Sequence, residues 1–445
     1  GIWGFDCSGE LTTTDGQHTS SGRVCMLTQT PPALVVAAGA SVSAVLVVHW
    51  LRRHARRQEL LGRWAKVRLV PQDATGVLIR LATQPDAVLA GVISLSQLKQ
   101  RIEALGLPPL LPREMHTLPV SSLAARVRGW ILTTATKFTV MQFNLLAEGL
   151  SSGPDATPPF VAARRSEYGG FDSVARPELA LAWETRKLRL LEEILRYAPD
   201  VLAVQECDHF EDLLLPALRL AGYDGVFAAK RSAPGLEYGF YSDGTAVLWR
   251  TAVFERLGAE RRVFTEADGS GSSRPFVLVL LRHVARGATL LVGSTHLKAK
   301  ASQENEELRA VQISQLLDAL EGRAAALADG VLLCGDFNTD PYDHPPPRSV
   351  RARCVPAVLR HPLGLRSAYP LPKDAHGRAR WWTTWKKRGE HEVKHTIDYI
   401  FHDAGLRATR ILAPPQEAEL EPARLPGLRY PSDHLSLVAE LEILS

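Results

Sequence analysis

The chain has 445 residues, which accommodate two or three domains, or one large domain with an extension. Hydrophobic residues make up 45% of the sequence and charged residues 22%, so the composition excludes a wholly disordered chain and a multi-span membrane protein. Residues 1–136 carry 14 basic and 8 acidic side chains, whereas residues 137–445 carry 38 basic and 40 acidic ones. A slightly acidic C-terminal region is not typical of a protein that neutralises a long run of phosphates.

The first 57 residues divide into two predicted ranges. Residues 1–30 are polar and rich in Ser, Thr and Gly, which indicates disorder. Residues 31–57 hold an uncharged stretch, 33–51, followed by four arginines, and 19 uncharged residues are about enough to cross a bilayer. We interpret this hydrophobic segment with its basic flank as a membrane anchor in contact with a bilayer, or as a targeting segment. A helix buried in the protein is the alternative.

Residues 58–136 are predicted to form a small module or a linker. A hairpin is expected across 72–76, between strands 67–70 and 77–81. A short helix is expected over 96–105, because serines precede it and Gly106 follows it.

From residue 137 the pattern changes to alternating strands and helices, which predicts an α/β catalytic domain over 137–445. Buried strands are expected at 138–143, 201–204, 246–249, 277–281, 290–294, 331–334, 396–401 and 435–444. Two amphipathic helices are expected. The first, 183–197, places Leu188, Leu191 and Leu195 on one face, and the second, 304–320, does the same with Leu308, Val311 and Leu316.

Polar side chains lie at or beside the ends of these apolar strands, and all of them can bind metal or move protons. They are Asn144, Glu206, His296, Asp336, Asn338, Asp398 and His434. A buried strand end is a costly place for a carboxylate unless it is paired or binds a metal. Any one of them is compatible with a structural role, but seven together indicate a site at one edge of a sheet, as in many α/β enzymes.

The residue types indicate the chemistry of this site. Oxygen ligands without thiolates favour Mg²⁺, with Mn²⁺ as the alternative, and Glu206 with Asn144 would satisfy such an ion. Two histidines, one of them beside an aspartate, suit proton transfer or the stabilisation of an anionic transition state. Together these groups predict phosphoester hydrolysis.

Six motifs in order carry a specific resemblance. They are Met141–Asn144, Gln205–Glu206, Thr295–Lys298, Gly335–Asn338, His395–Tyr399 and Ser432–His434. This set resembles the endonuclease/exonuclease/phosphatase superfamily over about residues 137–445. The resemblance implies a four-layer α/β sandwich, in which two packed mixed sheets are flanked by helices, with a separate N-terminal extension.

Within that superfamily the chain resembles the nocturnin and deadenylase-like branch, mainly through residues 205–209, 295–299 and 424–437. The resemblance implies catalytic roles for Asp336 and Asn338, which would activate and position water and the phosphoryl group. It implies that Asp398 orients His434 and that His296 stabilises the transition state. By the same resemblance Glu206 is the metal-binding glutamate and Asn144 its neighbour.

Lys230, Lys298 and Arg388 fall where nocturnins place cations that grip phosphate. Position 300 is Lys where the branch leads us to expect Arg, which keeps the charge but loses a bidentate contact. Two further groups have competing interpretations. The charged run 386–388 is either a solvated face or part of the substrate site. The cluster of Trp381, Trp382 and Trp385 either packs in the core or forms a platform on which a base stacks.

The nocturnin resemblance implies a Mg²⁺-dependent phosphatase that removes the 2′-phosphate of NADP⁺ or NADPH. The alternative is a 3′→5′ poly(A) exoribonuclease. Two further hypotheses are an enzyme that processes cyclic phosphates at RNA ends and a non-enzymatic scaffold that kept the fold. The expected partner is a phosphorylated dinucleotide or poly(A) RNA, and the catalytic domain is expected to be monomeric. The expected location is intracellular: mitochondrial or membrane-anchored if residues 33–51 act as proposed, and cytoplasmic otherwise.

Overall fold

A computed structural model of the chain describes residues 76–82, 88–118, 137–153, 167–344, 349–371 and 381–444. The chain divides into two units, residues 1–56 and 57–445, and the described residues all belong to the second. The predicted disordered range 1–30 and the hydrophobic segment 31–57 lie outside the described residues. No described helix has both the length and the apolar character that a membrane span requires.

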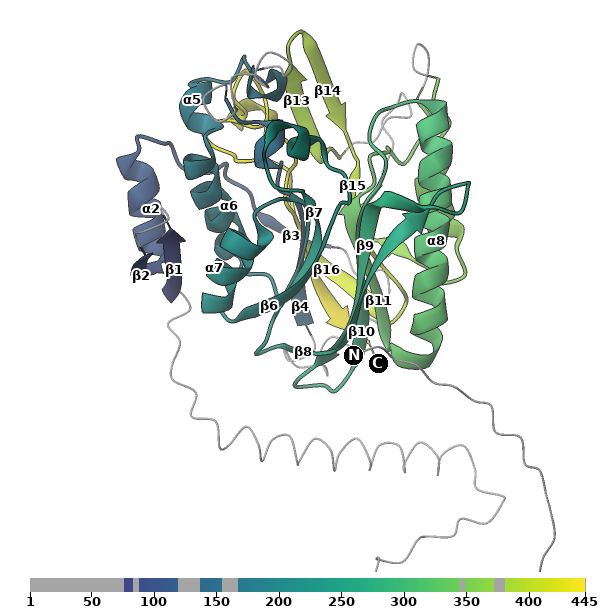
Figure 1. Ribbon diagram of the computed structural model, residues 1–445. Coiled ribbons are helices and arrows are strands. Elements are labelled where there is room, and N and C mark those ends of the chain that lie inside the picture. Colours follow the sequence, from purple (N-terminus) through teal and green to yellow (C-terminus); the bar gives the residue numbers. More distant parts are fainter. Residues whose placement is uncertain are drawn as a thin grey trace, which may run out of the picture. The chain divides into compact units, whose positions relative to one another are not determined.

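Two mixed sheets form the centre of the molecule (Figure 1). The larger has seven strands in the order β3 (Met115–Thr117), β16 (Leu406–Leu412), β17 (Leu437–Ile443), β4 (Lys137–Asn144), β5 (Val201–Cys207), β7 (Gly244–Arg250) and β6 (Tyr223–Ala229). The smaller has six, in the order β12 (Arg366–Ser367), β15 (Asp398–His402), β11 (Gly330–Asp336), β10 (Thr289–His296), β9 (Gly271–His283) and β8 (Phe254–Thr265).

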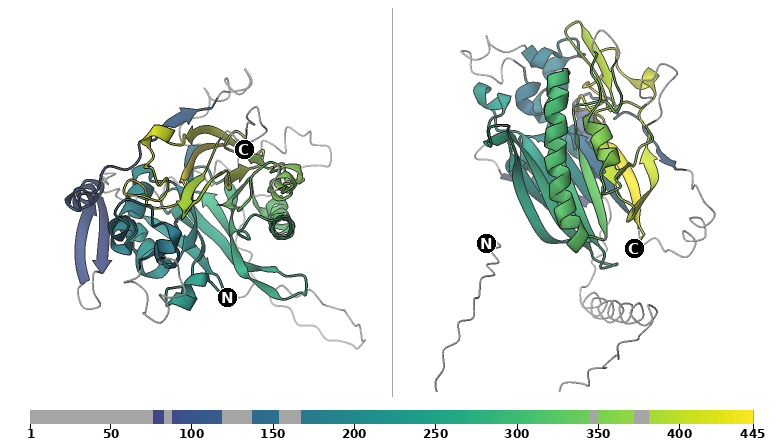
Figure 2. Two further views of the ribbon diagram at one scale, coloured as in Figure 1. Left: turned by 90° about the horizontal axis from the view of Figure 1, so that it is seen from above. Right: turned by 90° about the vertical axis from the view of Figure 1, so that its right-hand side faces the viewer.

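Helices cover the outer face of each sheet (Figure 2). On the seven-stranded sheet lie α6 (Trp183–Tyr197) and α7 (Leu215–Leu220), and α2 (Leu95–Ala104) packs against α6. Helices α8 (Gln303–Leu327) and α9 (Cys354–Arg360) lie on the other sheet. The shorter helices are η2 (Glu148–Leu150), η4 (Glu167–Gly170), α5 (Pro177–Ala180), η5 (Phe210–Leu214), η6 (Pro234–Tyr238) and η7 (Glu417–Glu419). The predicted four-layer α/β sandwich is confirmed.

Strand β4 shows why these segments read as continuous apolar runs. Phe138 and Val140 pack between the two sheets, whereas Met141 and Phe143 pack beneath the helices. Successive side chains of a strand point to opposite faces, so a strand that is covered on both faces carries apolar residues on both.

Parallel pairing brings the polar strand ends together. Strands β4 and β5 run parallel, with Asn144 opposite Gln205, and β10 and β11 run parallel, with His296 opposite Asp336. Strand β15 then pairs antiparallel with β11 and sets Asp398 opposite Asp336. Polar residues far apart in the sequence therefore meet at one edge of the sandwich.

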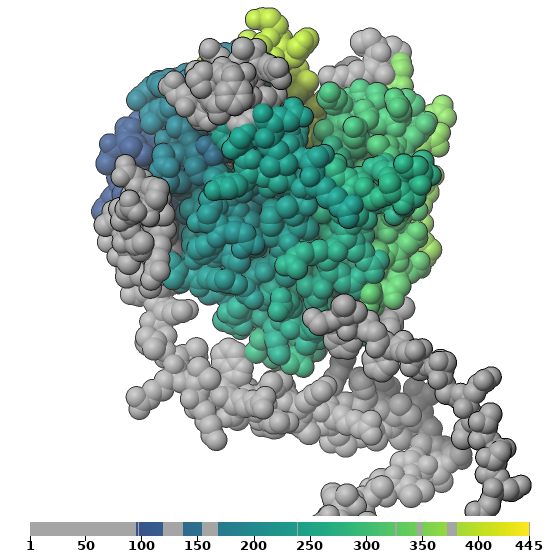
Figure 3. All heavy atoms as spheres, in the orientation of Figure 1, coloured from purple at the N-terminus to yellow at the C-terminus, as the bar shows by residue number. Residues whose placement is uncertain are grey.

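Two hairpins stand outside the main sheets. In one, β13 (Thr384–Arg388) pairs with β14 (His391–His395), and its yellow-green tip rises at the top of the space-filling view (Figure 3). In the other, β1 (Gly76–Ala82) pairs with β2 (Val88–Ser94). The sequence predicted a strand at 67–70 as the partner of this strand, across a turn at 72–76, and that pairing lies outside the described residues except for Gly76, where β1 begins.

Residues 95–118 pack directly on the sandwich, although the sequence placed them in a small module or linker. Helix α2, predicted at 96–105, lies against α6, and β3 pairs with β16 at the edge of the large sheet. Arg113 inserts its buried guanidinium between Ser436, whose carbonyl accepts from Nη2 at 2.8 Å, and Glu193 at 3.5 Å. The division of the chain at residue 136 stays a prediction.

The expected apolar face of α8 is wrong in one respect. Val311 is 52% exposed, and the buried positions are Ile313, Leu316, Leu317 and Leu320 together with a charged pair. Glu306 and Arg309, bonded to each other at 2.9 Å, continue the buried face toward the N-terminal end of the helix. A face that includes a buried ion pair cannot be found from hydrophobic spacing alone.

Candidate active site

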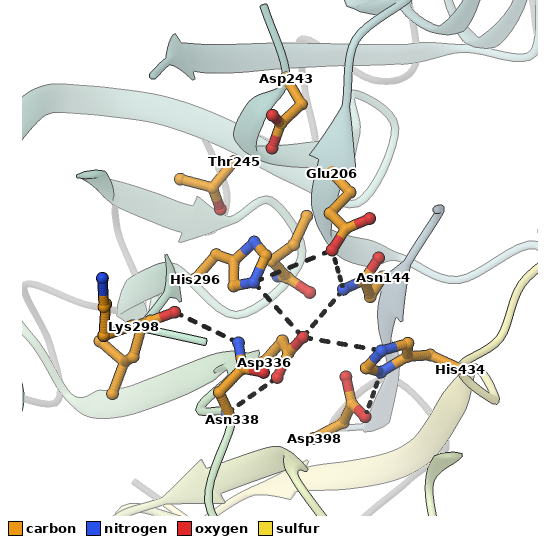
Figure 4. Close-up of polar contacts among 12 residues, drawn as sticks. Asn144, Glu206, Asp243, Thr245, His296, Lys298, Asp336, Asn338, Asp398 and His434 are labelled. Carbon is orange, nitrogen blue, oxygen red and sulfur yellow. Dashed lines mark hydrogen bonds and ion pairs between the residues drawn. The ribbon is translucent and has the colours of Figure 1, made fainter. Parts of the chain in front are cut away.

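Asn144, at the end of β4, links two carboxylates (Figure 4). Its Nδ2 donates to Asp336 Oδ2 at 2.9 Å and to Glu206 Oε1 at 3.3 Å, and its Oδ1 accepts the backbone N–H of Leu146 at 3.0 Å. In this geometry the amide nitrogen faces the carboxylates, so Asn144 positions Glu206 and Asp336. Its predicted role as a metal ligand stays a prediction.

Glu206 lies on a bulge of β5. The register between β5 and β7 shifts between Val204 and Cys207, and Glu206 adopts a left-handed conformation with φ of 50°. Such a conformation costs a non-glycine residue about 1 kcal/mol or more, and it concentrates at functional sites. Because a bulge redirects a side chain, it places the Glu206 carboxylate in the cleft instead of the sheet interior.

Asp398 and His434 form a buried pair. Oδ2 of Asp398 lies 2.8 Å from Nδ1 of His434, and Nε2 of the same ring lies 3.8 Å from Asp336 Oδ2. Burial alone would lower the pKa of His434, but the carboxylates of Asp398, Asp433 and Asp336 outweigh it and raise the pKa to about 9. His434 is therefore charged at neutral pH.

His296, at the end of β10, has the opposite character. Its Nε2 lies 3.5 Å from Asp336 Oδ2 and 4.0 Å from Glu206 Oε1. Burial lowers the pKa of His296 well below its ordinary value, and the neighbouring charges of Lys230 and Arg274 lower it further. One charged and one neutral imidazole in the same site divide acid–base tasks between them.

Asp336 and Asn338 share a tight turn after β11. The backbone N–H of Asn338 donates to Asp336 Oδ1 at 2.9 Å, and Asn338 adopts a φ of 54°. Its Nδ2 donates to the carbonyl of Leu297 at 3.2 Å, which fixes the amide next to β10. Burial, reinforced by the charge of Asp398, raises the pKa of Asp336 to about 7.

Glu206, His296, Asp336, Asn338 and His434 line a cleft of about 740 Å³ whose walls are rich in cations, and Asn144 and Asp398 lie behind this lining. Two predicted cations lie in it: Lys230, which pairs with Asp243, and Arg388, whose Nη2 lies 3.4 Å from Asp433 Oδ2. The third, Lys298, is not among the described residues that line the cleft, and its side chain points away from Asp336 (Figure 4). Lys300, two positions later, does line it.

Among the cleft residues, Arg274 and Asp433 were not proposed as parts of the site, and Lys386 entered the sequence analysis only as a member of the run 386–388. Lys386 bonds Asp433 at 2.6 Å, and Lys386 and Arg388 of the run 386–388 line the cleft, whereas Lys387 is not among the described residues that do. Arg274 stands near the start of β9, where no motif marks it. Asp433 was visible only as the neighbour of His434 in the last motif.

Buried side chains behind the site hold its loops. Arg186 of α6 donates to the carbonyls of Leu145 at 2.6 Å and Pro431 at 2.8 Å, and so joins the segments that follow β4 and precede His434. Trp382 and Trp385 are buried in the core, which confirms core packing over base stacking. Burial raises the pKa of the Cys207 and Cys334 thiols, so both are inert core residues, as expected.

The donor set fits a divalent cation. Single ligand atoms of Glu206, His296 and Asp336 lie within 4.8 Å of one another. Asn144 donates its neutral amide to both carboxylates, and burial lowers the pKa of the neighbouring His296 ring. Two carboxylates at this spacing favour a cation, and hard oxygen ligands match Mg²⁺ or Mn²⁺.

Comparison with known proteins agrees with this geometry. The pattern of the Endonuclease/Exonuclease/phosphatase family matches residues 141–434, from the end of β4 to His434. The chain belongs to this family. It is therefore a hydrolytic phosphoesterase or nuclease, as the sequence predicted.

Within the family the chain belongs to the nocturnin-like branch. It is 35% identical to nocturnin of Xenopus laevis over 306 residues, which cover 68% of this chain and 72% of that protein. Against human nocturnin it is 33% identical, covering 69% of this chain and 66% of the relative. The structure of the human nocturnin catalytic domain with bound sulfate matches 74% of this chain and 97% of that one, with a TM-score of 0.54 and 26% identity. ANGEL2, a 2′,3′-cyclic phosphatase, shares the fold with a TM-score of 0.56 at 21% identity, covering 75% and 98%.

Proposed function

We propose that this enzyme removes the 2′-phosphate from NADP⁺ or NADPH in a Mg²⁺-dependent hydrolysis. The observation that carries the proposal is the bounded cleft of about 740 Å³, with cations on two walls around Asp336. That volume falls in the range of roughly 300–1,000 Å³ that is usual for small-molecule sites. The resemblance to nocturnin supports the choice of dinucleotide.

The distribution of the cations supports a ligand that carries more than one phosphate. Lys230 and Arg274 stand on the wall formed by β6 and β9, and Lys386 and Arg388 on the wall formed by the β13–β14 hairpin. NADP(H) has a 2′-phosphate at one end and a pyrophosphate within the same molecule. One cationic wall would hold the phosphate that is cleaved, and the other would hold the pyrophosphate.

The chain's own residues can carry out an in-line hydrolysis. Asp336, with its raised pKa and its turn to Asn338, orients a water molecule and accepts its proton. His434, charged and held by Asp398, donates toward the developing negative charge, and the neutral His296 donates from the opposite side. Glu206, with Asp336, would hold the divalent ion, which would withdraw charge from the phosphoryl oxygens when bound.

A side-by-side assay of the full-length chain tests the substrate. The protein is incubated in Mg²⁺ with NADP⁺, NADPH or a short poly(A) RNA, and with a Glu206→Ala variant as the blank. Release of phosphate from the dinucleotides, with the RNA left intact, would support the proposal. Shortened RNA with untouched NADPH would overturn it in favour of a 3′→5′ exoribonuclease. We also propose a monomeric enzyme inside the cell, in an organelle or at a membrane if residues 33–51 act as an anchor or targeting segment.

A further inference from the structure

A second cluster of ligating side chains lies in the same cleft, outside the catalytic set. Nδ1 of His395 lies 2.5 Å from Asp340 Oδ2, and Nε2 of His344 lies 2.7 Å from the same oxygen. Single ligand atoms of the three residues lie within 4.8 Å of one another. All three line the cleft, so the cluster is open to the substrate space.

The fold holds this cluster rigidly to the catalytic residues. Asp340 stands two positions after Asn338 in the turn that follows β11, and His395 ends β14, three positions before Asp398. The second carboxylate oxygen, Asp340 Oδ1, accepts the backbone N–H of Thr396 at 2.7 Å. This contact orients the carboxylate so that Oδ2 is aimed at the two imidazoles, whose rings cross at 79° with centroids 5.5 Å apart.

We propose that Asp340, His344 and His395 form a binding site for Zn²⁺, distinct from the oxygen-rich site at Glu206. Two imidazoles and one carboxylate are a ligand set of borderline softness, which suits Zn²⁺ better than Mg²⁺ or Mn²⁺. The alternative is a purely structural cluster, in which the carboxylate of Asp340 accepts hydrogen bonds from the two histidines and no metal binds.

The geometry needs little change to accept the ion. Zn–N and Zn–O distances of about 2.0–2.2 Å set ligand atoms roughly 3.3 Å apart in a tetrahedral site. Nδ1 of His395 and Nε2 of His344 lie 2.5 and 2.7 Å from Oδ2 of Asp340. Each of these two distances would lengthen by less than about 1 Å when the ion replaces the hydrogen-bonding protons. Three protein ligands leave coordination positions free, and in the cleft these would take water or a phosphate oxygen of the substrate.

Metal titration of the full-length chain tests the site without any assay of hydrolysis. Zn²⁺ binding is measured by calorimetry, and Co²⁺ binding by its visible absorption, which reports imidazole ligation. The Glu206→Ala variant removes the other site, so one equivalent of Zn²⁺ or Co²⁺ is expected to remain in it. His344→Ala added to Glu206→Ala is expected to weaken this binding at least tenfold, and His361→Ala, a histidine that pairs with Glu321 away from the cluster, is expected to leave it unchanged.

The proposal fails if the Glu206→Ala variant binds neither Zn²⁺ nor Co²⁺. It also fails if adding His344→Ala or Asp340→Asn to Glu206→Ala leaves the metal affinity of Glu206→Ala unchanged. Thermal unfolding of each variant separates loss of ligands from loss of fold, and His344→Asn provides a smaller perturbation if the alanine variant is unstable. Because the readout is metal binding, its outcome is independent of whether the enzyme hydrolyses NADP(H).

Discussion

Nδ1 of His434 lies 2.8 Å from Oδ2 of Asp398, and both side chains are buried. This contact directs Nε2 toward Asp336 and stabilises the charged ring. Asp398→Asn keeps the shape but removes the charge that holds the imidazolium. We expect kcat to fall by roughly 10²–10⁴-fold, as it does when the aspartate of a comparable Asp–His pair is replaced. Steady-state kinetics measure the loss, and a kcat close to that of wild type would contradict the role of the pair.

Glu206→Ala and Asp336→Ala are each expected to abolish hydrolysis while the fold is kept. Each change removes a carboxylate at the centre of the site, and the loss of one transition-state contact of this kind is typically about 10²–10³-fold. Phosphate release and circular dichroism are the two measurements. Glu211→Ala is the matched control, since Glu211 is exposed in the helical turn just after Glu206. If Glu206→Ala or Asp336→Ala turned over substrate at a rate near that of wild type, the carboxylate it lacks would not be needed for hydrolysis.

Arg274→Ala is expected to lower kcat/KM by roughly 10–100-fold, the equivalent of one hydrogen bond to a charged group. Arg274 lines the cleft with its charge close to His296, so its loss weakens the phosphate contact and leaves the rest of the wall in place. The control is Arg282→Ala, on the same strand but paired with Glu255 at the surface. Equal effects of the two substitutions on kcat/KM would show that Arg274 does not contact the substrate.

Stability should fall between about pH 6.5 and 9 because of His209. Its ring nitrogens bond Asp212 and Glu148, each at 2.8 Å, and these contacts outweigh burial and raise the pKa of His209 to about 9. Since the folded state holds the proton more tightly than the unfolded state, the stabilisation is complete below pH 6.5 and disappears as the pH rises through 9. The shift corresponds to roughly 3 kcal/mol.

Urea unfolding at several pH values measures the contribution of His209 to the free energy of unfolding. The difference in unfolding free energy between wild type and His209→Gln is expected to shrink steadily from pH 6.5 to 9.5. A difference that stays constant over this range would mean that the contacts of His209 do not depend on its charge.

The sequence predicted the catalytic cluster because buried strands are easy to recognise and their ends converge. Asn144, Glu206, His296, Asp336 and Asp398 were found this way, and the structure brings them together. The cleft walls could not be predicted so well. Arg274 lies near the start of a strand. Lys298 does not line the cleft, whereas Lys300, which adopts a φ of 76°, does.

Several elements with polar surfaces were missed by the sequence analysis, as was β2, Val88–Ser94, despite its apolar sequence. Strand β8, Phe254–Thr265, buries only Phe254 and Phe264 and carries many charged residues, so it has no apolar run. Strand β3 is three residues long and none of its side chains is fully buried. Its existence depends on pairing with β16, which lies about 290 residues away in the sequence.

The edge formed by β3 and Arg113 determines how the enzyme can be shortened. A fragment that begins at residue 137 would leave the carboxylate of Glu193 buried without its guanidinium, a loss of about 3–5 kcal/mol for a buried pair. It would also turn β16 into a bare edge strand, which invites pairing between molecules. A soluble, active fragment should therefore start before α2, and precipitation of a shorter one would say nothing about the catalytic chemistry.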